Sequence, residues 1–109
     1  MYIPFEPKKI PALKSFQIDE IKRMMASGEI YVQSFPKGTI IHCKGDLISA
    51  HEIIIMGEVF ETQDKESPFR EIHGYESLLP SEILIKQTTY RYILIAGEDT
   101  LILFLPKNL

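Results

Sequence analysis

The sequence has a single cysteine, Cys43, among its 109 residues. One thiol cannot form an internal disulfide, and it excludes a cluster or zinc site held by cysteines alone. Such sparing use of cysteine is typical of a reducing compartment. We expect Cys43 itself to be a small buried apolar residue.

Long apolar runs and a surplus of basic residues are also missing. No stretch reaches the roughly 18 uncharged apolar residues of a transmembrane helix, and the first residues lack the pattern of a signal peptide. With 12 Lys and Arg against 15 Asp and Glu, the net charge is −3. The chain therefore has no basic excess for nucleic-acid binding, and we expect a cytoplasmic protein without membrane contact.

The apolar content is sufficient for one core, because 45% of the residues are hydrophobic. We expect a single domain over residues 1–109. Residues 1–14 are rich in proline and predict an extended lead-in that apolar side chains pin to the domain. Over residues 16–27, Ile18, Ile21 and Met25 recur at helical spacing, and Gly28 suits a C-terminal cap.

Short apolar runs alternate with glycine turns between residues 35 and 60. Pro36 presets its own torsion and Gly38 can adopt a left-handed one, so they predict a tight turn. Gly45-Asp46 and Gly57 predict two further turns. Strand-length runs with turn signals about every 10 residues are typical of an antiparallel barrel or roll.

This stretch resembles the cyclic nucleotide-binding domain family, the sensor domain of Crp/Fnr-type transcription regulators. The family pattern is Pro-x-Gly, then Gly-Asp or Gly-Glu, then Gly-x-Val, and its intervals match here. The matching residues are Pro36-Lys37-Gly38, Gly45-Asp46 and Gly57-Glu58-Val59. The resemblance implies a mainly β fold, a double-stranded β-helix or jelly roll over residues 29–105. It also implies one helix before the roll and one short helix inside it.

The remaining elements follow from local patterns. We expect strands over 29–35, 39–43, 51–56, 58–60, 69–73, 90–96 and 100–105, a polar loop over 61–68, and the internal helix over 81–86.

Residues 74–91 depart from the phosphate-binding cassette of nucleotide-binding members. In that cassette a Gly-Glu pair opens the short helix, and an arginine farther on pairs with the phosphate. Here Ser81-Glu82 takes the place of the pair if a small gap is allowed. The arginine position carries Tyr90, and Arg91 is one residue beyond it.

Ser81, Glu82 and Arg91 are therefore the candidate ligand-binding residues, as a remnant of the cassette. A shift of one residue along a strand changes the face, so Arg91 would point away from a pocket unless a bulge restores it. The interpretation we favour is that Ser81 caps the helix, Glu82 is solvated and Arg91 lies on a strand surface. Leu78 and Leu79 put apolar bulk at the opening of the pocket.

A second hypothesis is a cupin-like metal-binding barrel or small enzyme that uses His42, His51, Glu52 and His73. The cupin pattern needs two histidines separated by one residue, whereas these are far apart. Adjacent strand residues such as His51 and Glu52 also face opposite sides. We assign no metal, no cofactor and no catalytic residue, and nothing in the spacing requires haem ligation.

The resemblance implies an effector-sensing regulatory domain, not an enzyme, whose partner is a small molecule. The residue changes in the cassette indicate that this molecule is not cyclic AMP. In Crp/Fnr-type regulators a long dimerising helix and a helix-turn-helix domain come next. Both lie outside these 109 residues. DNA contact would need such a downstream segment, and we expect a weak homodimer at most. A stand-alone interaction domain that keeps only the fold is the third hypothesis.

Overall fold

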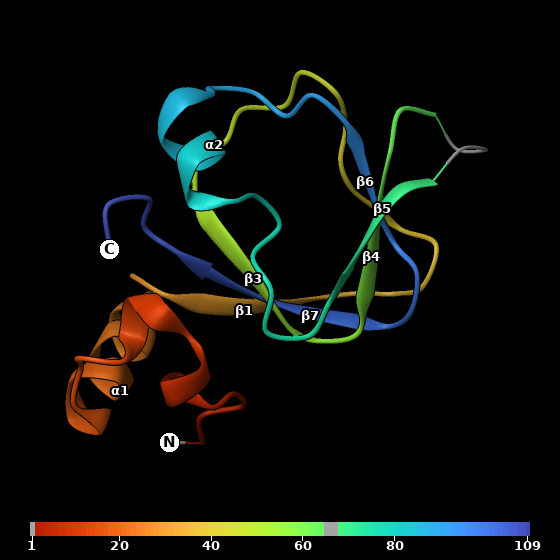
Figure 1. Cartoon of the computed structure of the whole chain (residues 1–109). Helices are drawn as coiled ribbons and strands as arrows, with labels where there is room; N and C mark the ends of the chain where they lie inside the picture. Colours follow the sequence, from red (N-terminus) through yellow and green to blue (C-terminus); the bar gives the residue numbers. More distant parts are fainter. Residues whose placement is uncertain (1, 65–67) are drawn as a thin grey trace.

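The computed structural model describes residues 2–64 and 68–109 (Figure 1). Part of the predicted loop over 61–68 lies outside these residues. In chain order the elements are η1 (Pro7–Lys9), η2 (Pro11–Leu13), α1 (Ile18–Ser27), β1 (Tyr31–Phe35), β2 (Ile40–His42), β3 (His51–Met56), β4 (Glu58–Thr62), β5 (Pro68–His73), α2 (Ser81–Lys86), β6 (Ile93–Ala96) and β7 (Thr100–Leu105).

The strands form two antiparallel sheets, as the glycine spacing predicted. One sheet has the order β1-β7-β3 and the other β2-β6-β4-β5. The inner core lies between them, where Ile54 and Ile102 of the first sheet meet Val59, Ile72 and Leu94 of the second. The mainly β roll is therefore confirmed.

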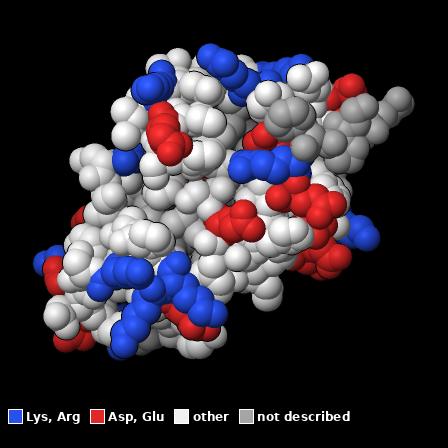
Figure 2. Space-filling view, viewed as in Figure 1, with Lys and Arg blue, Asp and Glu red and all other residues white. Residues whose placement is uncertain are grey.

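The N-terminal segment covers the outer face of the three-stranded sheet. Ile10, Leu13 and Ile21 pack there against Ile53 of β3 and Leu103 of β7. Successive strand residues face opposite sides, so β3 buries Ile54 inward and Ile53 outward, which explains its continuous apolar run. Lys and Arg side chains gather over this N-terminal segment in Figure 2.

The lead-in was predicted to be extended, but it forms two 3₁₀ turns. Each turn begins with a proline, whose fixed torsion suits the first helical position. Helix α1 begins at Ile18, where the Glu20 carboxylate accepts a hydrogen bond from the Gln17 backbone N–H at 3.0 Å. It ends at Gly28 with φ 83°, which confirms the predicted cap. Its buried residues are Ile21 and Met24, whereas Ile18 is exposed.

Two strand boundaries differ from the prediction. Strand β4 continues through Glu61 and Thr62, which were assigned to a loop, because both residues are buried and pair with β6. Strand β6 begins only at Ile93, not at residue 90. The backbone of Tyr90 is instead hydrogen-bonded to the turn before β3. Its carbonyl accepts from the Gly45 N–H at 2.8 Å, and its N–H donates to the Asp46 carbonyl at 2.9 Å.

Cys43 is exposed, contrary to our expectation of a buried apolar residue. It begins the Gly45-Asp46 turn, where its backbone N–H donates to Asp46 Oδ2 at 2.8 Å. The surface turn holds Cys43 at the periphery of the roll, where its side chain faces solvent. Among the described residues, no helix has the length and apolarity to cross a membrane.

The three motif glycines all adopt left-handed backbone conformations, and Gly57 is also tightly enclosed. Its φ is 105°, and a Cβ there would lie 2.7 Å from the Asp99 carbonyl oxygen and 2.5 Å from Thr100 Oγ1. We therefore expect Gly57→Ala to lower the free energy of unfolding by about 2–4 kcal/mol, measured by chemical denaturation.

Gly74→Ala is the matched control, because a Cβ at Gly74 meets no atom within 4 Å. Its stability should stay within about 0.5 kcal/mol of the parent chain. Equal stability of the two variants would contradict the role assigned to Gly57.

Candidate functional site

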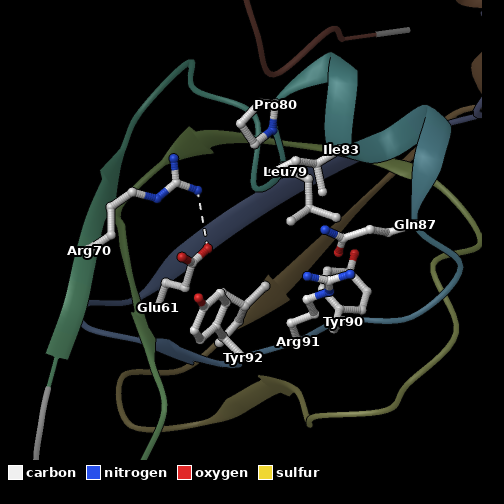
Figure 3. Close-up of a pocket in the computed structure, with 10 residues that line it drawn as sticks. Glu61, Arg70, Leu79, Pro80, Ile83, Gln87, Tyr90, Arg91 and Tyr92 are labelled. Carbon is white, nitrogen blue, oxygen red and sulfur yellow. Dashed lines mark hydrogen bonds and ion pairs between the residues drawn. The ribbon is translucent and has the colours of Figure 1, made fainter.

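A cavity of about 250 Å³ opens beneath α2, between that helix and strands β4 and β5 (Figure 3). Its walls are mostly apolar, with three charged side chains and one amide. The lining residues are Glu61, Arg70, Leu79, Pro80, Ile83, Gln87, Tyr90, Arg91, Tyr92 and Leu94.

Helix α2 has the predicted bounds, but Ser81 is not its N-cap. Pro80 holds that position, and its carbonyl accepts hydrogen bonds from the backbone N–H groups of Ile83 and Leu84. The helix turns Leu84 toward the core and Ile83 toward the cavity. Ser81 and Glu82 are exposed and do not line the cavity.

Glu61 and Arg70 form an ion pair at one wall of the cavity, 3.2 Å between carboxylate oxygen and Nη2. The same Nη2 donates to the Leu78 carbonyl at 2.9 Å. Glu61 is 6% exposed, so a charged carboxylate at this position needs the Arg70 guanidinium as its partner. The two residues are directly paired across β4 and β5.

Sequence reasoning missed this pair because it ended β4 before Glu61. Extending the strand by alternation from Val59 would have placed Glu61 on the inner face.

Arg91 lies in the bend before β6 and lines the cavity beside Tyr90 and Gln87 (Figure 3). The prediction that Arg91 points away from the pocket assumed that it lies in a strand. It does not apply, since β6 begins two residues later. Arg91 is exposed and makes no hydrogen bond or ion pair with any residue that the structure describes. Of the three sequence-predicted residues, it alone lines the cavity.

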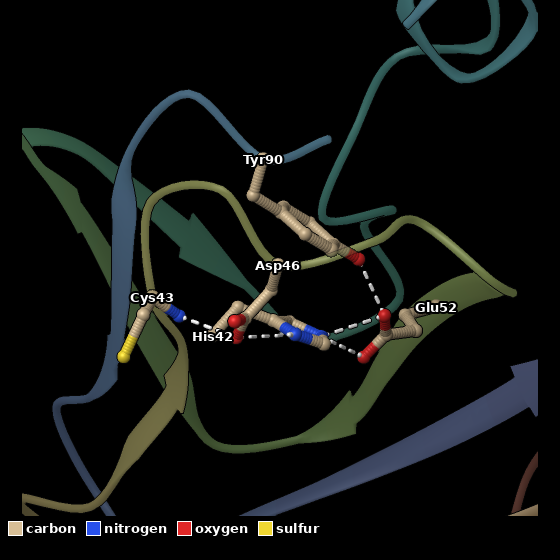
Figure 4. A network of polar contacts seen from close by, with 5 residues as sticks. All are labelled: His42, Cys43, Asp46, Glu52 and Tyr90. Carbon is tan, nitrogen blue, oxygen red and sulfur yellow. Dashed lines mark hydrogen bonds and ion pairs between the residues drawn. The ribbon is translucent and has the colours of Figure 1, made fainter. Parts of the chain in front are cut away.

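Inside the roll, Tyr90 takes part in a polar network centred on Glu52 (Figure 4). His42 Nε2 lies 2.8 and 2.7 Å from the two Glu52 carboxylate oxygens. The Tyr90 hydroxyl donates to Oε2 at 2.5 Å. The His42 and Tyr90 rings stack with centroids 4.0 Å apart. Glu52 is 4% exposed, so these contacts supply the partners that a buried carboxylate needs.

The backbone explains why these three side chains meet. Glu52 shares the inner face of β3 with Ile54, two residues on. The pairing of β2 with β6 shifts register between Ile40 and His42, which re-aims the histidine. Sequence reasoning named His42 and Glu52 as a metal hypothesis but did not foresee a partnership with Tyr90.

Burial shifts two pKa values at this end of the roll. It raises the pKa of Tyr90 far above its ordinary value, and the nearby charges of Glu52 and Asp46 and the hydrogen bond to Glu52 raise it further. Tyr90 is therefore a permanent donor. Burial also lowers the pKa of His51, against the opposing effect of the Glu52 charge. His51 Nε2 lies 2.9 Å from Ser77 Oγ.

The residues of the cupin hypothesis do not form one site. His42 and Glu52 belong to the network just described, and His51 contacts Ser77. His73 lies on the surface of the other sheet, 3.4 Å from a Glu58 oxygen and 3.6 Å from a Glu71 oxygen. Within the described ranges, Glu58, Glu71 and His73 are the single group of three acidic, histidine or cysteine side chains with atoms close enough for a metal, and Glu58 among them is half-buried.

Comparison with known proteins gives a match in structure alone. No family model and no curated protein matches the sequence. A transcriptional regulator from Thermotoga maritima superposes with a TM-score of 0.64 at 22% identity, covering 81% of this chain and 70% of that chain. A cyclic nucleotide-binding-like protein from Brucella abortus gives 0.65 at 19% identity, covering 93% and 87%. An EAL enzyme in a half-site-occupied form gives 0.61 at 26% identity, covering 72% of each chain.

The chain thus has the fold of cyclic nucleotide-binding-like domains, which a transcriptional regulator also contains. This confirms the resemblance inferred from the glycine motif. A shared fold does not specify a ligand, so the ligand has to be argued from the cavity and its neighbouring network.

Removing the Tyr90 hydroxyl should destabilise the domain, because it leaves the buried Glu52 carboxylate with one donor fewer. We expect Tyr90→Phe to lower the free energy of unfolding by about 1–3 kcal/mol. Tyr31→Phe is the control, since the Tyr31 ring stacks on Phe104 at 4.8 Å but is 47% exposed. Chemical denaturation that gives equal losses for both variants would contradict the network's role.

The lowered pKa of His51 predicts a loss of stability in mild acid. The neutral form is favoured in the folded state, whereas the unfolded chain protonates near its ordinary pKa of 6.5. This contribution is therefore complete above that pH and is lost as the pH falls through the folded-state pKa. In urea titrations between about pH 7.5 and 5.5, His51→Gln should lose less stability on acidification than the parent chain. Parallel pH profiles would refute the assignment.

Proposed function

We propose that this chain is the effector-sensing domain of a Crp/Fnr-type transcription regulator, and that its effector is not a cyclic nucleotide. The fold supports the first part, because solved structures that share it include a transcriptional regulator and a cyclic nucleotide-binding-like protein. The second part depends on one observation, the network of Tyr90 with Glu52 and His42.

In the sequence resemblance, Tyr90 falls at the arginine position of the cassette, and on that basis we place the network where nucleotide-binding members carry the arginine. The Tyr90 hydroxyl donates to Glu52. A cyclic phosphate entering this region would meet a buried carboxylate whose hydrogen bonds are already made by Tyr90 and His42.

The arginines that line the adjoining cavity are Arg91, which is exposed, and Arg70, which is already bound to Glu61. Burying a phosphate without compensation is strongly unfavourable. Loss of one charge-assisted contact alone costs about 1.5–3 kcal/mol.

The cavity supplies a route from effector to output. Its walls combine α2 and the residues before it with the segment 87–92 and the β4–β5 pair. An effector that contacts both sides would favour one position of α2 relative to the sheet, and its differential affinity sets the size of the shift. In a regulator, that shift would be passed to the dimerising and DNA-binding segments.

A second candidate function is an effector-sensing domain that controls an enzyme instead of a DNA-binding domain. The likeness at 26% identity to a solved structure named as an EAL enzyme supports it, because this fold there belongs to a protein named as an enzyme. In both candidates the domain described here binds an effector, and no reaction is assigned to its own residues.

The proposal predicts that cyclic AMP and cyclic GMP do not bind. Calorimetric titration of either nucleotide at tens of micromolar should give no binding heat. A dissociation constant below about 10 μM that is lost in Arg91→Ala would overturn the proposal, because it would show that Arg91 acts as the phosphate-binding arginine.

A further inference from the structure

The cavity under α2 carries an unbalanced positive charge. Two of its lining side chains are cations, Arg70 and Arg91, and one is an anion, Glu61. Glu61 is bound to Arg70 at 3.2 Å. Arg91 has no partner among the residues that the structure describes, and its guanidinium lies beside the aromatic side of the cavity (Figure 3). The charge that remains is one positive unit, which suits a monoanion.

Arg70, in the wall of the same cavity, also has a donor atom without a partner in the part of the chain that the structure describes. Arg70 Nε is buried and has no hydrogen-bond partner among the described residues. Buried donors without a partner are rare and unfavourable, which makes them markers of sites where something else binds. This observation is independent of the charge of Arg91 and indicates a ligand with hydrogen-bond acceptors.

The size and walls of the cavity limit the body of the ligand. An apolar cavity of about 150 Å³ holds one benzene molecule, and this one measures about 250 Å³. The comparison indicates room for one ring with a short substituent. Leu79, Ile83 and Leu94 offer aliphatic contacts, and Tyr90 and Tyr92 offer aromatic ones.

We propose that the effector is a small organic monocarboxylate with a single ring or a short aliphatic chain. This inference depends on the proposed function, because it names the ligand class of the same cavity. The carboxylate binds the Arg91 guanidinium in the forked geometry that arginine favours, and the apolar body packs against Leu79, Ile83 and Leu94. A dianionic phosphate fits less well, since it would bring an unneutralised charge toward Glu61.

The test compares acids with their uncharged amides of nearly the same shape. Benzoate, phenylacetate and hexanoate, with benzamide, phenylacetamide and hexanamide as controls, are titrated into the labelled domain and followed by backbone NMR shifts. We expect at least one acid to bind with a dissociation constant on the order of 0.1–1 mM. Its amide should bind about 10-fold more weakly, and the shifts should centre on residues 79–94.

Arg91→Gln tests the residue that gives the preference for acids. It should weaken the acid about 10-fold and leave the amide unchanged. Arg23→Gln is the control, because Arg23 is exposed on α1 and does not line the cavity. It should bind like the parent chain.

Three results would overturn the inference: equal binding of acid and amide, an acid preference that survives in Arg91→Gln, or no binding of any probe at about 10 mM. Equal binding would leave the proposed function standing, because the cavity would still take a small effector. Cyclic nucleotide binding in the separate titration would instead refute the proposed function.

Discussion

A buried carboxylate inside the roll, that of Glu52, determines much of the architecture around it. A charge at 4% exposure is tolerated only with partners, and they come from His42 on β2 and from Tyr90 before β6. Strands β2 and β3 belong to different sheets. The network therefore joins the two sheets and fixes the segment that leads into β6, which the backbone bonds of Tyr90 to the Gly45-Asp46 turn also hold.

The same network accounts for the character of the cavity. Because the Tyr90 hydroxyl donates to Glu52, this side chain is held inside the roll and supplies no cation to the cavity. The charges that line it come instead from the Glu61–Arg70 pair and from Arg91. The chain thus keeps the fold of a cyclic nucleotide-binding domain, while the ligand that we propose for its cavity is smaller than a cyclic nucleotide.

Most of the fold could be predicted because it depends on local rules. Gly38, Gly45 and Gly57 need left-handed conformations that few other residues adopt, and their spacing set the strands between them. The site was harder, because it depends on contacts distant in sequence. Glu52 and Tyr90 are 38 positions apart, and no local pattern brings them together. Glu61 was misplaced because its acidic neighbourhood reads as a loop, although pairing with β5 and β6 buries it.

We propose that Tyr90, Glu52 and His42 replace the phosphate site. A crystal structure of the domain grown with millimolar cyclic AMP tests this replacement. We expect the Tyr90 hydroxyl on Glu52, as in the structure described here, and no nucleotide inside the roll. Ordered nucleotide with its phosphate on an inward-turned Arg91, and Tyr90 displaced from Glu52, would contradict it.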